Sequence, residues 1–445
     1  MKRIIIGLVA ILGALVLIAA GWYFRPWSEY SPAEIQAATQ PENLPDTFRD
    51  MAAVFPYRTI EPDESARPLP RALDPENVSY DFQGETRTVN DWLEESRSTG
   101  LMVLHGGTVV HEQYLLGSTP DSRHTSWSVG KSFVATLIAM AIEEGRIANL
   151  DQTAEMFAPQ FAGTAYGQTT LRHLLMMSAG VDFEEDYNAP DSDIRRLFFG
   201  ANIFGRNIDS MVAEVERNRP AGEDLHYVSA NTQVLSAVVR GVWNAPLAQI
   251  VEEKIWRPIG MTGEAYWNQN VPGDDGMAIG YCCLNATLSD YARFGQFYLQ
   301  GGEWDGRRLV PEGWVQQATR PNAPFQEPGP EGVYPHRGYG LHFWVPEGYD
   351  GEYFMAGVYG QYIWVDERRD IVIARTAADT AWSGRTAESI AAMRALAAHY
   401  GGPAGTTAEA AGMPDDDAPD STTSGDAEAD DGSDAGSDDG EPDNE

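Results

Sequence analysis

Apolar residues follow strand-like and helix-like periods in the central part of the chain. Residues 101–104 and 108–110 flank a Gly-Gly turn, and residues 362–365 and 371–374 flank a charged turn, so each pair predicts a β-hairpin. Residues 128–144 carry apolar side chains on one helical stripe and stop at Gly145. Further helices are predicted within residues 171–177, 231–243 and 387–399. Strands near both ends of this region predict one sheet built from distant segments, with an inserted helical region between them.

The first 24 residues predict a membrane-spanning helix. Lys2 and Arg3 precede an uncharged stretch of 21 residues, from residue 4 to residue 24, which can cross a hydrocarbon layer of ~30 Å. The two basic residues would remain cytoplasmic, and the aromatic residues 22–24 would lie at the far interface. The alternative is a cleaved secretory signal with small residues at 19–21. We favour an uncleaved anchor, and in both cases we expect the rest of the chain to be exported.

Composition divides the remainder into three segments. Residues 25–75 are rich in proline and acidic residues, which predicts a linker with a short helix or two. Residues 76–402 are expected to form the globular domain. Residues 403–445 contain 15 acidic and no basic residues among small polar ones, which predicts a disordered, solvated tail.

Charge and cysteine content exclude several classes of protein. The 445 residues carry a formal net charge of −35, which argues against nucleic-acid binding because that requires a basic face. Cys282 and Cys283 are the only cysteines, and because they are adjacent we do not expect a disulfide between them. The eight histidines show no metal-ligand spacing, and no nucleotide or dinucleotide fingerprint occurs. We therefore expect neither a metal nor a cofactor.

Lysine usage gives the first indication of chemistry. Only three of the 31 basic residues are lysines, and Lys131 is the one that lies inside an apolar helix. Ser128 precedes it by three residues, so the two side chains share one helix face. Burial and the positive end of the helix dipole would lower the pKa of Lys131 and allow it to accept the proton of Ser128. The alternative is a capping serine followed by a lysine that reaches solvent.

Two further segments add candidate groups. Tyr227 and Ser229 lie two residues apart before a predicted helix, so in an extended segment they point to the same side, where they could relay a proton to a leaving group. Taken alone, Tyr227 is more typical of a half-buried core residue than of a catalytic one. Gly357 and Gly360 precede a predicted strand and would allow the backbone to approach a ligand closely.

Together these segments resemble the serine β-lactamase and penicillin-binding-protein superfamily, and most closely its class C-type branch of family VIII esterases and 6-aminohexanoate-dimer hydrolases. The resemblance covers roughly residues 78–399 and rests on five segments in the family's order: residues 126–133, 171–180, 227–235, 288–295 and 357–361. It implies an α+β fold of the β-lactamase/transpeptidase type, an antiparallel sheet flanked by helices.

The resemblance also implies the roles of individual residues. Ser128 would be acylated, Lys131 would take its proton, and Tyr227 would pass a proton to the leaving group. The backbone N–H groups of Ser128 and Val358 would form the oxyanion hole. The substrate would contact Tyr187, Ser229, Gly357 and Tyr359.

Two departures from the family pattern bear on the substrate. Ser229 stands where β-lactamases carry asparagine, and Phe354-Met355-Ala356-Gly357 stands where the third motif normally reads Lys-Thr-Gly. That lysine meets the carboxylate of penicillins, so its loss favours a small ester or amide that is neutral or differently charged.

The leading hypothesis is a serine hydrolase anchored in the bacterial inner membrane by a single span, with its catalytic domain on the periplasmic side. The alternative hypothesis is an acylated sensor or binding domain with little turnover, and a catalytically silent scaffold is the third.

Overall fold

The computed structural model describes residues 2–28, 30–329 and 334–404. The predicted acidic tail lies outside these residues, apart from its first two positions. The helices are α1 (Lys2–Phe24), α2 (Pro32–Ala38), α3 (Leu44–Arg49), α4 (Val89–Glu95), α5 (Gly130–Glu143), α6 (Leu171–Leu175), α7 (Asp193–Asn202), α8 (Ile208–Ala213), α9 (Ser229–Trp243), α10 (Leu247–Val251), α11 (Leu288–Leu299), α12 (Trp314–Ala318) and α13 (Thr386–Gly401).

The strands form two larger sheets and two short ribbons. They are β1 (Tyr57–Ile60), β2 (Ser79–Phe82), β3 (Glu85–Thr88), β4 (Ser98–His105), β5 (Thr108–Tyr114), β6 (Arg123–Thr125), β7 (Ala265–Asn268), β8 (Leu284–Thr287), β9 (Glu303–Trp304), β10 (Arg307–Arg308), β11 (Arg337–Tyr339), β12 (Trp344–Pro346), β13 (Glu352–Gly357), β14 (Gln361–Asp366) and β15 (Ile371–Ala377).

The main sheet has seven antiparallel strands in the order β11-β12-β13-β14-β15-β4-β5. Both predicted hairpins are present as β4–β5 and β14–β15, and Gly106 and Gly107 adopt positive φ in the first turn. Strand β15 pairs with β4, so the sheet joins segments about 270 residues apart, with Ala374 opposite Met102. The predicted α+β architecture is confirmed.

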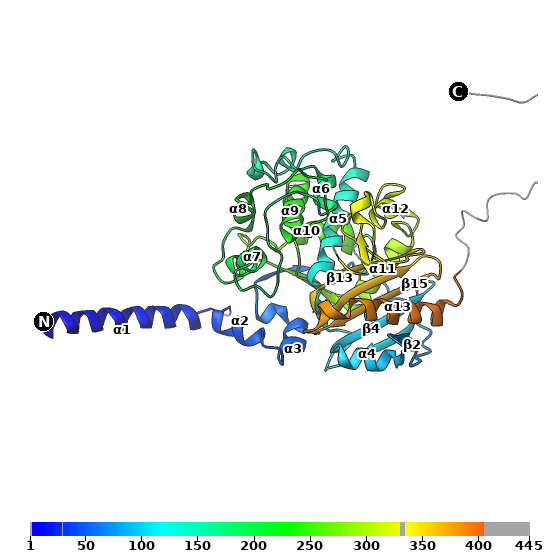
Figure 1. The fold of residues 1–445 in the computed structure, drawn as a ribbon, viewed down its shortest axis with the longest axis horizontal. Coiled ribbons are helices and arrows are strands. Elements are labelled where there is room, and N and C mark those ends of the chain that lie inside the picture. The colour runs from blue at the N-terminus through cyan, green and yellow to red at the C-terminus, as the bar shows by residue number, and fades with distance from the viewer. Residues whose placement is uncertain (1, 29, 330–333, 405–445) are drawn as a thin grey trace, which may run out of the picture. The chain divides into compact units, whose positions relative to one another are not determined.

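Alternation along the strands supplies two apolar faces. Met102 and Val372 pack with α5 and α11 in the larger core, whereas Val103 and Ile373 pack with α4 and α13 in a second core. Figure 1 shows α4 and α13 on one side of the sheet and α5 and α11 on the other. The helical insertion α6 to α10 extends the larger core, so the helix α5 is buried between the sheet and the insertion.

Helix α5 is the element that positions the predicted nucleophile. It begins one residue earlier than Lys131, and a short 3-10 turn, η2 (Trp127–Val129), leads into it. Nearly all its residues are buried, and Gly145 follows its end with a positive φ of 69°, as the sequence predicted.

The segment 25–75, expected to be a linker, contains the two short helices α2 and α3. It also packs on the body of the protein. Strand β1 pairs with β7 in the four-stranded sheet β1-β7-β8-β6. Phe48 and Met51 belong to a small apolar cluster that also contains Tyr266 of β7.

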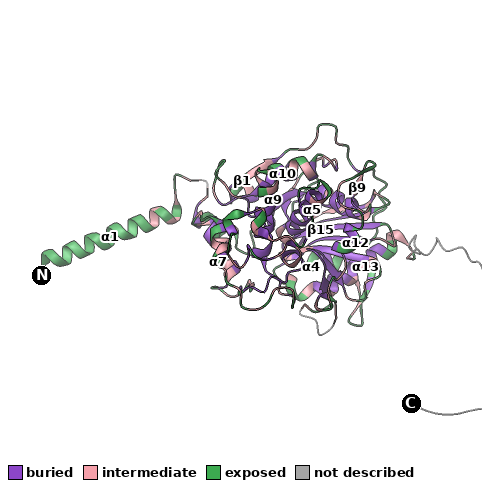
Figure 2. Cartoon of the chain, turned by 90° about the horizontal axis from the view of Figure 1, so that it is seen from above, coloured by how far each residue is buried: buried purple, intermediate pink, exposed green. Residues whose placement is uncertain are grey.

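In the described part of the chain, α1 is a helix long and apolar enough to cross a membrane by itself, with a mean hydropathy of 2.9. None of its residues is buried, as Figure 2 shows. A secretory signal sequence near an N-terminus also meets this criterion of length and apolarity.

Candidate active site

Ser128 lies at the tip of a constrained turn between β6 and α5. The preceding residue, Trp127, has a φ of +43°, in the left-handed region that most side chains avoid. Its indole packs against Phe48, with ring centroids 5.4 Å apart, and against Tyr359 at 5.6 Å. These contacts hold the backbone in the conformation that presents Ser128 to a cavity.

Lys131 follows one turn later and points at Ser128. Its Nζ donates hydrogen bonds to Ser128 Oγ at 2.9 Å and to the carbonyl oxygen of Tyr281 at 2.8 Å. Only 1% of the Lys131 residue is exposed, and burial lowers its pKa from 10.5 to about 7, while the charge of Glu185 acts in the opposite direction. A neutral amine is therefore accessible near neutral pH.

Tyr227 lies beside Lys131 and Ser128. Its ring centroid lies 5.2 Å from Lys131 Nζ. Burial raises the pKa of its phenol, and a hydrogen bond with Ser128 opposes this rise. The ring stacks on Trp344 at 5.4 Å, which fixes its orientation. The structure thus brings together the three residues that the sequence suggested for catalysis.

Ser229 and Tyr187, both predicted to contact the substrate, converge on a carboxylate that the sequence did not single out. Glu185 accepts hydrogen bonds from the Ser229 N–H at 2.9 Å and from Tyr187 Oη at 2.7 Å, and a third from Ser229 Oγ. The pKa of Glu185 lies above its ordinary value because burial raises it. Lys131 and these hydrogen-bond donors lower the pKa, but by less.

Gly357 ends strand β13 directly beside the backbone of Ser128. A Cβ atom at this position would lie 2.6 Å from the Ser126 carbonyl oxygen and 3.0 Å from the Ser128 nitrogen. No side chain fits between the two segments, so glycine is required by this close approach. The next residues, Val358 and Tyr359, form a 3-10 turn in which Tyr359 has a φ of +62°.

Two chambers meet at Ser128. The larger has a volume of about 330 Å³ and a mostly apolar lining that includes Phe48, Met51, Phe55, Phe198, Tyr281 and Cys282. The smaller, of about 110 Å³, is lined by residues that include Glu185, Tyr227, Tyr334, Arg337, Trp344 and Trp382. Ser128, Tyr187 and Val358 line both chambers, which places Ser128 at their junction.

The profile of the Beta-lactamase family matches residues 89–398, about 70% of the chain. The chain belongs to the β-lactamase family. Within it, the chain is 29% identical over 290 residues to a 6-aminohexanoate-dimer hydrolase of Paenarthrobacter ureafaciens, an alignment that covers 64% of this chain and 73% of the relative. The sequence resemblance is thereby confirmed, and this β-lactamase-family protein is a serine hydrolase of the amidase or esterase type.

Solved structures share the fold of this β-lactamase-family hydrolase. A Bacillus anthracis protein that carries a provisional 6-aminohexanoate-dimer hydrolase name superposes with a TM-score of 0.73 at 23% identity, covering 84% of this chain and 97% of that one. An octameric penicillin-binding protein homologue from Pyrococcus abyssi superposes with a TM-score of 0.52 at 18% identity, over 70% of this chain and 76% of that one.

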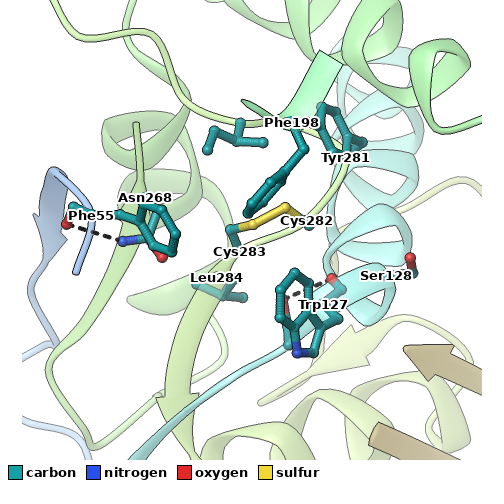
Figure 3. The surroundings of a disulfide bond; sticks show 12 residues. Phe55, Trp127, Ser128, Phe198, Asn268, Tyr281, Cys282, Cys283 and Leu284 are labelled. Carbon is teal, nitrogen blue, oxygen red and sulfur yellow. Dashed lines mark hydrogen bonds between the residues drawn. A yellow bond between two sulfur atoms is a disulfide. The ribbon is translucent and has the colours of Figure 1, made fainter. Parts of the chain in front are cut away.

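The expectation that Cys282 and Cys283 would not pair is wrong. In the structure the two adjacent residues form a disulfide, and both are buried. Cys283 has a φ of +75°, and this left-handed turn of the backbone accommodates the bond between neighbours. Figure 3 shows the disulfide with Trp127, Phe198 and Tyr281 around it. Because Cys282 lines the larger chamber and follows Tyr281, the disulfide lies in the wall that anchors Lys131.

Sequence analysis of this hydrolase missed Glu185, Tyr281 and Arg337. Glu185 stands in an acidic run, residues 184–186, in which no local signal separates the half-buried residue from its exposed neighbours. Tyr281 contributes a backbone carbonyl, which any residue could supply. Within residues 2–28, 30–329 and 334–404, no cluster of three or more histidine, cysteine or acidic residues could hold a metal ion.

Proposed function

We propose that this chain is a membrane-anchored, exported serine hydrolase that cleaves small ester or amide bonds through an acyl-enzyme on Ser128. The observation that carries the proposal is the 2.9 Å hydrogen bond between Lys131 Nζ and Ser128 Oγ, together with burial that lowers the pKa of this lysine to about 7. An amine that is neutral near pH 7 can accept a proton from a hydroxyl in contact with it.

In the acylation step, the neutral Lys131 amine takes the proton of Ser128 as Oγ attacks the carbonyl carbon of the substrate. The negative charge that develops on the carbonyl oxygen would be met by the N–H groups of Ser128 and Val358. The close approach of Gly357 to the backbone of residues 126–128 supports this pairing of the two segments.

Collapse of the tetrahedral intermediate breaks the bond to the leaving group. The proton held by Lys131 returns through Tyr227 to the leaving alcohol or amine, which departs neutral and leaves Ser128 acylated. The hydrogen bond of the Tyr227 side chain with Ser128, which Lys131 Nζ also contacts at 2.9 Å, supports this route. A water molecule then attacks the ester carbon by the same sequence, releasing the acid and restoring Ser128.

Four residues around the junction of the chambers are proposed to contact the substrate: Tyr187, Ser229, Gly357 and Tyr359. Tyr187 lines both chambers, while Ser229 and Tyr359 line the larger and Gly357 the smaller. Tyr187 and Ser229 are held by Glu185, so their orientation is fixed before the substrate arrives.

Anchoring by α1 is supported by its length and apolarity and by contacts at its C-terminal end. Trp22 stacks on the exposed Phe204 at 5.5 Å, and Arg25 Nη2 donates to the carbonyl oxygen of Ile203 at 2.8 Å.

An uncleaved N-terminus is tested by the intact mass of the protein purified from membranes, which should include residues 1–24. When protease is added to spheroplasts, digestion of the chain beyond residues 1–24 with protection of those residues would support a periplasmic domain. Recovery of the mature chain in the soluble fraction would contradict anchoring.

The hydrolase proposal is tested with the full-length protein in detergent and a p-nitrophenyl ester of a short acid. Sustained turnover that Ser128→Ala abolishes, and that Ser126→Ala retains, supports the proposal. Equal activity of the wild type and Ser128→Ala rejects Ser128 as the nucleophile. One equivalent of nitrophenol per chain, followed by a stable acyl label, contradicts turnover and supports the trapping alternative.

A further inference from the structure

Exposed aromatic side chains gather where α1 meets the rest of the protein. Trp22 and Phe24 belong to the last turn of α1, and Trp27 follows that helix. Phe204 comes from a distant part of the chain and stacks on Trp22, with ring centroids 5.5 Å apart. These four residues, which we call the aromatic surface, are between 40% and 74% exposed. Exposed aromatic residues that adjoin one another mark a surface that another molecule covers.

A rigid turn presents Phe204 to the outside. Gly205 has a φ of +60°, and its N–H donates to the carbonyl oxygen of Ala201 at 3.0 Å, which closes the end of α7. Within this turn Ile203 packs against the small apolar cluster beside β7, whereas Phe204 is 62% exposed. Packing inside the protein therefore accounts for Ile203 and leaves the aromatic side chain of Phe204 uncovered.

The contact with Trp22 sets the depth of Phe204 relative to a membrane. This step rests on the proposed function, in which α1 crosses the bilayer and remains uncleaved. Residues 4–24 form an uncharged stretch roughly 30 Å long, which matches the thickness of a hydrocarbon layer. Trp22 then lies within about one helical turn of the far edge of that layer, at the level where aromatic belts occur. Phe204, which stacks on Trp22, lies at the same level.

Two further contacts hold the surrounding chain at that depth. Arg25 Nη2 donates to the carbonyl oxygen of Ile203 at 2.8 Å, which joins the end of α1 to the turn after α7. Trp27 folds back along α1, so that its ring lies 3.7 Å from the position of a Cβ atom on Gly21. Trp27 and Phe204 are therefore both at the level of the last turn of α1.

We propose that Trp27 and Phe204 lie in the headgroup region of the membrane that α1 crosses, and that they dock the body of the hydrolase on the bilayer. The occupant of the aromatic surface is a phospholipid bilayer, because the membrane-spanning helix of the same chain ends within this surface. Helix α7 lies on the side of the body that faces α1 (Figures 1 and 2), and its Ile194 and Phe198 line the larger chamber. Docking therefore holds this wall of the chamber at the membrane surface.

The test places a fluorescent reporter beside Phe204 and leaves the phenylalanine in place. Arg206→Cys, at an exposed position two residues further on, is labelled with a nitrobenzoxadiazole iodoacetamide without reductant, and the identically treated wild type gives the background. The full-length protein is reconstituted into phosphatidylcholine nanodiscs, with or without brominated chains. Phe24→Cys reports the interface. Ala398→Cys, in the last turn of α13, reports the opposite side of the body (Figures 1 and 2).

Bromine should quench the reporter at position 206 as strongly as the one at position 24, and should leave the one at position 398 unquenched. Adding Trp27→Ser and Phe204→Ser to Arg206→Cys should remove most of this quenching. The matched control adds Leu73→Ser and Met156→Ser, which replace two other exposed apolar side chains, and it should retain the quenching. A reporter at position 206 that behaves like the one at position 398, as it would if a second copy covered Phe204, would overturn the docking surface. Quenching that survives Trp27→Ser and Phe204→Ser would also overturn it.

The docking surface and the proposed function fail in different ways. An intact mass that lacks residues 1–24 would show that the anchor is cleaved, which would overturn the anchoring and the docking surface together. An intact chain whose reporter is quenched at position 24 and unquenched at position 206 would show that the docking surface alone is wrong. Hydrolysis that depends on Ser128 is measured separately with the p-nitrophenyl ester.

Discussion

Lys131 Nζ lies 2.9 Å from Ser128 Oγ, and no described carboxylate lies within ion-pair distance of this amine. Lys254 offers the opposite case, since its Nζ pairs with Glu144 at 2.7 Å near the surface. A buried lysine without a counter-ion destabilises the fold when it is charged, and the same property makes it a base near neutral pH.

Replacing Lys131 by methionine should stabilise the fold while abolishing activity. The folded wild type binds this proton only below about pH 7, whereas the unfolded chain binds it up to about pH 10.5. The wild type therefore becomes more stable relative to Lys131→Met as the pH rises, by about 2 to 3 kcal/mol between pH 7 and 9. Urea unfolding at both pH values measures this difference. The control Lys254→Met should change stability by about 1 kcal/mol or less. An effect of Lys131→Met that is the same at pH 7 and pH 9 would refute a buried amine.

Glu185 should set the pH at which the enzyme becomes active. Its charge raises the pKa of Lys131, so Glu185→Gln removes this effect and should move the midpoint of the pH–rate profile to lower pH. We also expect kcat/KM to fall by about tenfold, because the hydrogen bonds with Ser229 and Tyr187 are weakened. Glu184→Gln, which neutralises the exposed neighbour, should leave the midpoint in place. A midpoint that stays unchanged in Glu185→Gln would contradict the coupling of Glu185 to Lys131.

Local sequence patterns predict much of the fold and of the candidate site, because the spacing of residues along one strand or helix determines which side chains lie on the same face. Apolar runs on either side of a Gly-Gly turn predicted β4 and β5, and those on either side of a charged turn predicted β14 and β15. The spacing of Ser128 and Lys131 predicted their contact. The roles proposed for Tyr227 and Val358 come from the resemblance to a known family.

The features that local patterns did not reveal depend on long-range contacts. The half-buried Glu185 is held by hydrogen bonds from Tyr187 and from Ser229, which is 44 residues away. The wall contributed by Phe48 and Met51 depends on the packing of a proline-rich segment against β7, which its composition does not indicate. Arg337 reaches the chamber through the pairing of edge strands, and no motif marks it.

Gly357→Ala should impair acylation while the protein remains folded. Its new methyl group would lie 2.6 Å from the Ser126 carbonyl oxygen, and the resulting shift would move β13 away from Ser128. We expect kcat to fall by roughly 100- to 1,000-fold, the range seen when an oxyanion-hole donor is removed. Gly384→Ala is the matched control, because nothing lies within 4 Å of the added methyl group. Wild-type kcat in Gly357→Ala would remove the support for an oxyanion hole formed with Val358.

The disulfide between Cys282 and Cys283 should withhold both thiols from alkylation. In the native protein, and after unfolding without a reductant, we expect mass spectrometry to find no maleimide adduct, whereas unfolding with a reductant should yield two per chain. Breaking the ring loosens the backbone after Tyr281, which anchors Lys131, so Cys282→Ala/Cys283→Ala should lower kcat/KM. Alkylation of both residues in the unreduced protein would show that the thiols are free.

The pH dependence of Ser128 acylation tests the central claim most directly. A neutral fluorophosphonate reacts with a serine nucleophile without needing a leaving-group relay, so its rate of reaction with the full-length wild type reports the base that activates Ser128. We predict that the rate rises with pH through a midpoint of about 7, the pKa to which burial lowers Lys131. A rate that is independent of pH between 5.5 and 9, or a midpoint near the ordinary lysine value of about 10.4, would contradict activation of Ser128 by a neutral Lys131.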